Sequence, residues 1–200
     1  MTDPASASRA ARIVPFHRAV PQYDPRSPYL QVPRGQFTFD QEGNEGPHAF
    51  SRILHKPPGS ASGVTIGRGY DLGRRSAAEV RHTLVAAGVP ESDAAIMARG
   101  AGLTGWAAAR FVERYGRALP PISLEAQSAL FTNTIYPAYE REAERLATKA
   151  DVHDKFREHG VVDWKKLDPR IREMLVDLTF RGDYTPEART HLQPHVARND

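Results

Sequence analysis

The sequence from residue 76 onward places apolar residues three and four positions apart, as amphipathic helices do. Val80, Leu84 and Val85 show this spacing first, and Gly88 ends their segment. The same reasoning predicts further helices over 92–99, 104–116, 123–139 and 168–182, and a last one beginning at Thr185-Pro186. This part of the chain therefore reads as a mainly helical region.

Local signals fix where several of these helices begin. Ser76 followed by Glu79 is a capping box, and Asp168-Pro169 places proline in a first helical turn. Pro137 predicts a kink or break in the helix begun at Ser123. The large aromatic residues of the helical region are expected to be core: Trp106, Phe111, Phe131 and Trp164.

The pattern before residue 76 is different. Residues 37–73 are rich in glycine and aromatic residues, and short β-type runs at 50–54 and 63–68 are joined by K-P-P-G-S-A-S-G. Residues 1–34 are rich in proline and arginine with little periodicity, which predicts an extended, weakly ordered arm. We therefore expect two parts, an arm over 1–34 and one domain over 35–200 that combines a small α/β lobe with a helical lobe.

Composition adds mild constraints. The 200 residues include 40% hydrophobic residues and carry a net charge of +3, which suits an anionic partner but falls short of a nucleic-acid footprint. The absence of cysteine excludes disulfides and thiol chemistry. No apolar run is long enough to insert into a membrane, and the N-terminus lacks the apolar core of a secretory signal. We expect a protein made in the cytoplasm without a signal peptide.

Candidate chemistry is concentrated in two short stretches, F-T-F-D-Q-E-G-N-E-G and S-G-V-T-I-G-R-G-Y-D-L-G. Glycosidic cleavage needs a proton donor and a second carboxylate on the opposite face of the sugar, and Glu42 and Asp71 supply that pair. Thr65 lies between them in a glycine-rich strand whose backbone a ligand can approach closely. The predicted substrate-binding residues are Gly67, Gly69 and Tyr70.

Surroundings assign the roles of the carboxyls. Phe37, Phe39 and Phe50 provide apolar groups that favour a protonated Glu42 as general acid, whereas Asp71 in a glycine-rich turn favours the ionised form of a base. Glu45 is a second candidate for the acid.

The order Glu42, Thr65, Asp71 with the T-x-G-x-G-x-D run resembles the muramidase domain of pesticin and the related phage-type lysozymes. The resemblance covers residues from about 37 to 182. It favours Glu42 over Glu45 as the acid, because Glu42 directly precedes Gly43 as in the family motif. It departs from the simplest phage lysozymes, whose aspartate precedes the threonine, because Gly59 stands at that position here. It implies an α+β lysozyme-like fold with the active-site cleft between the small mixed lobe and the helical lobe. It also implies inverting hydrolysis of the β-1,4 bond after N-acetylmuramic acid, with Thr65 and Asp71 positioning the attacking water.

That resemblance predicts peptidoglycan glycan strands as the substrate, and an antibacterial effector that acts in the periplasm of competitors. Type VI delivery, a secretion-system partner and an immunity protein that occludes the cleft would follow. The alternatives are a phage endolysin, a lytic transglycosylase, and a non-catalytic wall-binding or adaptor module. No cofactor or metal is expected, since His48 and His55 belong to no compact ligand motif.

Overall fold

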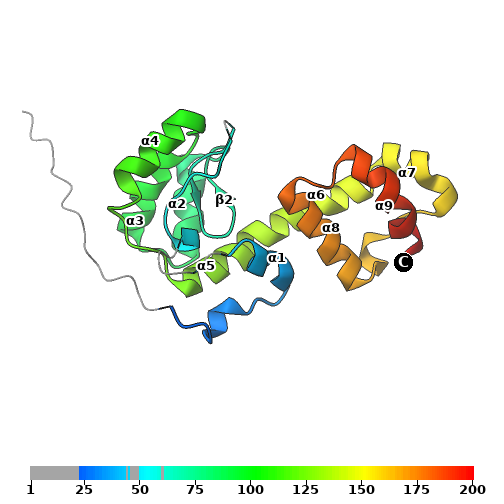
Figure 1. Cartoon of the computed structure of the whole chain (residues 1–200), viewed down its shortest axis with the longest axis horizontal. Helices are drawn as coiled ribbons and strands as arrows, with labels where there is room; N and C mark the ends of the chain where they lie inside the picture. Colours follow the sequence, from blue (N-terminus) through cyan, green and yellow to red (C-terminus); the bar gives the residue numbers. More distant parts are fainter. Residues whose placement is uncertain (1–22, 44, 46–49, 60) are drawn as a thin grey trace, which may run out of the picture.

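The computed structural model describes residues 23–43, 45, 50–59 and 61–200. Most of the predicted arm, His48 and Ser60 of the predicted turn lie outside these ranges. Figure 1 shows an elongated molecule in which one long helical run, α5 to α6, joins two groups of helices. The hairpin and α2–α4 lie at one end of this run, and α7–α9 lie at the other.

The elements follow one another along the chain with short connections. The α-helices are α1 (Gln36–Gln41), α2 (Ala77–Ala86), α3 (Glu91–Met97), α4 (Gly105–Tyr115), α5 (Leu124–Leu130), α6 (Tyr136–Ala147), α7 (Ala150–Phe156), α8 (Pro169–Arg181) and α9 (Pro186–Arg198). The 3-10 helices are η1 (Pro28–Leu30), η2 (Phe50–Arg52), η3 (Ala98–Gly100), η5 (Arg157–His159) and η6 (Trp164–Lys166), and η4 (Phe131–Ile135) is a π-helix.

The α+β lysozyme-like fold expected from the sequence is wrong. The described residues are predominantly helical, and strand is confined to the antiparallel pair β1 (Thr65–Ile66) and β2 (Tyr70–Asp71). Gly67 and Gly69 take positive φ values of 66° and 98°, so the chain turns after two residues of strand. The predicted strand at 50–54 begins instead as the 3-10 helix η2, and this segment reaches the hairpin through a single bridge, His55 to Thr65. The described residues therefore contain no sheet large enough to form a mixed lobe.

The helix starts read from local signals are confirmed. The Ser76 side chain accepts from the Glu79 amide at 3.1 Å, and Asp168 and Thr185 cap α8 and α9 in the same manner. Gly182 ends α8 in the left-handed conformation. These boundaries depend on neighbours within one turn, so the sequence alone defines them.

The helix begun at Ser123 does not break at Pro137. The turn before it widens into the π-helix η4, and Pro137 follows this widened turn as the second residue of α6. The run α5–η4–α6 therefore stays helical from residue 124 to residue 147.

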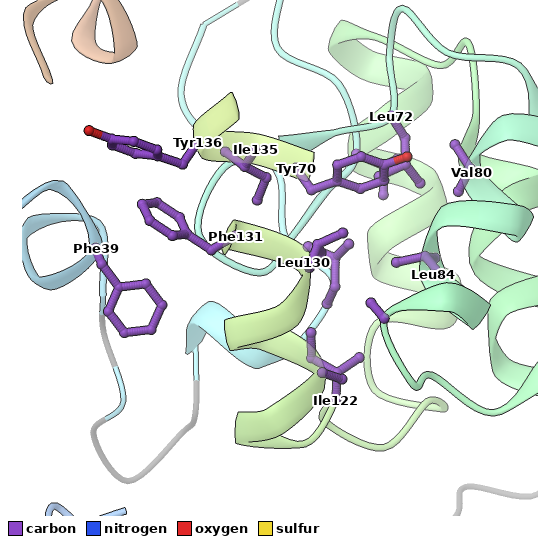
Figure 2. Packing of buried hydrophobic residues seen from close by; sticks show 14 of the residues in the cluster. Phe39, Tyr70, Leu72, Val80, Leu84, Ile122, Leu130, Phe131, Ile135 and Tyr136 are labelled. Atoms are coloured by element: carbon purple, nitrogen blue, oxygen red, sulfur yellow. The ribbon is translucent and has the colours of Figure 1, made fainter. Parts of the chain in front are cut away.

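The core forms around this run. Leu130, Phe131, Ile135 and Tyr136 project from it and are buried, and Figure 2 shows them between Phe39 on one side and the residues of the hairpin and α2 on the other. The Phe39 and Phe131 rings meet edge to face with centroids 5.0 Å apart.

Trp106 is not part of this core, contrary to the expectation. Its side chain is 73% exposed beneath the Arg110 guanidinium, whereas the other three aromatic residues expected in the core are buried. The buried face of α4 is formed by Ala108, Phe111 and Tyr115, and Trp106 lies about half a turn away from it.

The described end of the predicted arm packs on the domain. Leu30 and Val32 are partly buried against the core, and the Val32 amide donates to Gln36 Oε1 at 2.8 Å. Among the described residues, no helix combines the length and apolar character needed to cross a membrane.

Candidate active site

Glu42 directly follows α1, at the end that lies beside α8. The two helices run side by side, with Gly35 N donating to Glu173 Oε1 at 3.1 Å and Thr38 Oγ1 donating to Asp177 Oδ1 at 3.0 Å. This register brings Glu42 close to the last turn of α8. The glutamate is half-buried and is the C-cap residue of α1.

The surroundings of Glu42 favour its protonated form. Burial raises the pKa of Glu42, the negative charge of Asp177 raises it further, and Arg181 opposes them. Asp177 is itself buried and is held by Thr38 and by Arg181, whose Nε lies 3.2 Å from Asp177 Oδ2. A second fixed carboxylate therefore helps to keep a proton on Glu42.

Asp71 is exposed at the end of β2 and is held by backbone amides. Gly63 N donates to Oδ2 at 3.2 Å, and Gly73 N donates to Oδ1 at 2.6 Å. A Cβ at Gly63 would lie 2.2 Å from Asp71 Oδ1, so the carboxylate needs glycine at this position. The aspartate is thus fixed in place and open to solvent, unlike Glu42.

Thr65 pairs directly with Asp71 across the hairpin, which places both side chains on the same face. Thr65 is only 3% exposed, and its hydroxyl donates to Gly63 O at 3.4 Å. It therefore contacts the same glycine whose amide holds Asp71.

Tyr139 of α6 links the two carboxyls, which come from segments far apart in sequence. Burial raises the pKa of Tyr139, and the negative charges of Asp71 and Glu42 both raise it further against the opposing charge of Arg75. The Tyr139 ring stacks on Phe180 of α8 with centroids 4.4 Å apart. The structure thus brings Glu42 and Asp71 within electrostatic reach of one hydroxyl group.

The sequence did not single out Tyr139 or Phe180. Each was counted only in the helical pattern of its own segment, and nothing in that pattern indicates that α6 and α8 meet beside the hairpin. A signal was present in Gly69, whose missing Cβ leaves room for the Phe180 ring, since an added Cβ would lie 2.4 Å from Phe180 Cζ.

The predicted substrate-binding residues lie against protein atoms. Gly67 faces Leu130, Gly69 faces Phe180, and the Tyr70 side chain is fully buried beneath the Arg75 guanidinium. In this structure, these three residues allow the hairpin to pack closely against the helices. A role for them in substrate binding stays a prediction.

Glu45, the second candidate for the acid, sits in a buried ion-pair cluster. Its carboxylate lies 2.9 Å from Arg52 Nε and 3.1 Å from Arg68 Nη2, and Gln127 donates to it at 2.7 Å. Its side chain is 6% exposed. The Glu45 carboxylate is thus occupied by three donors in a structural cluster, so the geometry favours Glu42 as the acid.

Arg68 also connects the two sequence motifs. It donates to the Phe39 carbonyl, lies 3.6 Å above the Phe39 ring, and fills the space where Gly43 lacks a side chain. Because these contacts join the end of α1 to the hairpin, the segments carrying Glu42 and Asp71 are held together.

Asp71 lines one hollow, and a second hollow is lined by the Asp177–Arg181 pair that lies beside Glu42. One, of about 500 Å³, is lined by Ala61, Ser62, Asp71, Arg74, Arg75 and Tyr139. The other, of about 380 Å³, lies between α1 and α8 and includes Phe37, Met174 and the Asp177–Arg181 pair. Within the described ranges, no group of three or more histidine, aspartate or glutamate side chains is arranged to hold a metal ion.

Residues 35–200 match the model of a family described as a domain of unknown function, DUF8812, and the chain belongs to that family. No curated protein and no solved structure matches it. The family description assigns no activity, so the function is argued from the geometry above.

Proposed function

We propose that this chain is a peptidoglycan hydrolase that cleaves the β-1,4 bond between N-acetylmuramic acid and N-acetylglucosamine. One observation carries the proposal: two carboxyl groups have unlike surroundings, Glu42 half-buried beside the Asp177–Arg181 pair and Asp71 exposed and held by the backbone amides of Gly63 and Gly73. Pairs of carboxyls whose environments differ in this way divide the acid and base roles of glycoside hydrolysis.

Glu42 is the general acid. Its raised pKa keeps a proton available, and the two side chains beside it, Asp177 and Arg181, fix the charge environment in which the proton is held. It protonates the glycosidic oxygen as the bond to the anomeric carbon breaks, so the leaving sugar departs as a neutral alcohol.

Asp71 is the general base. It accepts a proton from the water that attacks the anomeric carbon on the opposite face, and the product has inverted configuration. The amides of Gly63 and Gly73 hold the carboxylate in position, and Thr65 supports it through Gly63. In this scheme Thr65 is a positioning residue.

The order of the three residues supports this reading, because it resembles the pesticin-like muramidases. The proposal extends to biology: an antibacterial effector acting in the periplasm of a target cell, with an immunity protein and a secretion-system component as partners. A phage endolysin would use the same chemistry. A lytic transglycosylase would use a single acid and release anhydro-sugars, and a non-catalytic wall-binding module would release nothing.

The test is digestion of purified peptidoglycan followed by mass spectrometry of the products. We expect reducing-end muramic acid fragments from the unmodified chain and a rate at least about 100-fold lower from Glu42→Gln, since general acid catalysis is typically worth ~10²–10⁴-fold. Asp71→Asn should lose a similar amount, and Thr65→Ala should lose less because it leaves proton transfer intact.

Glu113→Gln is the matched control, because Glu113 is an exposed carboxylate that lies on α4 rather than beside Tyr139. It should digest peptidoglycan at the rate of the unmodified chain. Anhydro-sugar products would identify a transglycosylase, and an undiminished rate in Glu42→Gln would remove Glu42 from the mechanism.

A further inference from the structure

The hollow beside Asp71 contains two adjacent arginines with different surroundings. Arg75 is engaged: its Nε donates to Asp71 O at 3.1 Å, its guanidinium pairs with Glu79, and it covers the Tyr70 ring. Arg74 is exposed and, in the part of the chain that the structure describes, makes no hydrogen bond, ion pair or ring contact. Its positive charge is therefore uncompensated by the protein.

Asp71 does not neutralise Arg74, although it lies only three residues away and lines the same hollow. Each oxygen of the Asp71 carboxylate accepts one hydrogen bond, from the amide of Gly63 or of Gly73, and within the described ranges no ion pair joins Asp71 to Arg74. The hollow thus holds a carboxylate fixed by backbone groups and, beside it, a guanidinium free to bind an anion from solution.

A free guanidinium presents a planar fork of N–H donors, which matches the two oxygens of a carboxylate. The proposed substrate carries such groups on its peptide stems, and on the lactyl ether of those muramic acid residues that bear no stem. A neutral glycan made only of N-acetylglucosamine carries none. The volume of about 500 Å³ is within the range of ordinary ligand sites.

We propose that Arg74 forms a subsite for a carboxylate of the glycan strand, in the hollow that also holds Asp71 and Tyr139. The inference rests on the proposed function, because it assumes that a wall glycan occupies this hollow. It makes Arg74 a specificity-determining residue that selects carboxylate-bearing strands over neutral ones.

The experiment measures equilibrium binding of soluble, uncrosslinked peptidoglycan fragments to the Glu42→Gln chain, which keeps the ligand intact. Half of the fragments have their free amines acetylated, and the other half are acetylated and then have their carboxyls converted to carboxamides. We expect about tenfold tighter binding of the fragments with free carboxyls, corresponding to one charge-assisted hydrogen-bonded contact. The preference should shrink as salt is raised.

Adding Arg74→Gln should reduce the affinity for free-carboxyl fragments to that for amidated ones, and Arg74→Lys should recover part of the difference. Arg117→Gln removes the same charge from an exposed arginine that also has no partner among the described residues, and it should preserve the full preference. Thermal unfolding checks that each variant is folded. A tenfold preference that survives Arg74→Gln, or no preference in the parent, overturns the subsite.

Hydrolysis by the unmodified chain is measured in parallel, so that the two proposals fail separately. A carboxylate preference that depends on Arg74, without hydrolysis, overturns the proposed function and supports the subsite. Hydrolysis without the carboxylate preference overturns only the subsite. If neither kind of fragment binds, the subsite is also overturned.

Discussion

Glu42 has a neighbour that a solvent-exposed glutamate would lack, the buried carboxylate of Asp177. An ionised Glu42 would lie beside this second negative charge, and Arg181 compensates for it only in part. The consequence is a proton held more tightly in the folded chain than in the unfolded chain.

This difference predicts a pH dependence of stability. Because the pKa of Glu42 is raised above its ordinary value of 4.5, the folded state binds more protons than the unfolded state in the pH range between that value and the raised pKa. The free energy of unfolding therefore falls, relative to that of Glu42→Gln, as the pH rises from below 4.5 through the raised pKa. Urea denaturation of both proteins across this pH range measures the difference.

The protonation of Glu42 also determines how the rate of hydrolysis should change with pH. If Glu42 is the general acid, as proposed, hydrolysis should decline as the pH rises through the raised pKa of Glu42, because its carboxyl then loses the proton. A stability difference between the two proteins that stays constant with pH, or that changes in the opposite direction, would contradict the assigned environment of Glu42.

At this scale the sequence identified residues but not their surroundings. Glu42 was preferred over Glu45 only because Gly43 follows it, whereas the physical difference is that Glu45 is held by Arg52 and Arg68. Asp177 and Arg181 are more than 130 positions from Glu42, so no local pattern could reveal that they surround it.

The hairpin positions Asp71, and Gly69 in its turn can be compared with Gly102, which lies in the connection between η3 and α4. Gly69 and Gly102 both have positive φ, 98° and 75°, but Gly69 abuts Phe180 whereas nothing lies within 4 Å of a Cβ added at Gly102. Alanine substitutions at the two positions therefore distinguish the cost of left-handed backbone from the added cost of a steric contact.

We predict that Gly102→Ala destabilises the chain by about 1–2 kcal/mol, the usual cost of placing a side chain in left-handed backbone. Gly69→Ala should cost about 1–3 kcal/mol more, because its methyl group must displace the Phe180 ring that supports Tyr139. Denaturant unfolding compares the two variants. Equal losses of unfolding free energy in the two variants would mean that the Phe180 ring moves aside without an energetic cost.

Helices whose starts are set by local capping residues were predicted well. Strands, which depend on pairing with another segment of the chain, were not. Ser76, Asp168 and Thr185 satisfy amides in the first turns of α2, α8 and α9, so those helices start where the sequence indicates. The strands at 50–54 and 63–68 were inferred from β-type residues alone. A strand also needs a pairing partner of matching length. Because the chain turns early, at Gly67, β1 and β2 pair over only two residues each.

For the whole molecule, the relevant prediction concerns the compartment in which the chain acts. Peptidoglycan lies outside the cytoplasmic membrane, and a chain without cysteine needs no change in redox conditions to fold there. We expect lysis of a Gram-negative host when the chain carries an added secretory signal, and none when the chain stays in the cytoplasm.

Periplasmic Glu42→Gln is the control, since it should accumulate without lysis. Culture turbidity and cell shape are the measurements. Killing by the cytoplasmic form would point to an intracellular target and contradict the assignment to the wall.

The contact between Gly43 and Arg68 also limits how this family can diverge. A methyl group at position 43 would lie 2.2 Å from Arg68 Nη1, a guanidinium that is already tied to Glu45 and Phe39. A side chain can therefore be inherited at position 43 only after the arginine has been lost or moved. Across relatives, the two positions should change together, so that their substitutions are correlated although 25 positions separate them in the chain.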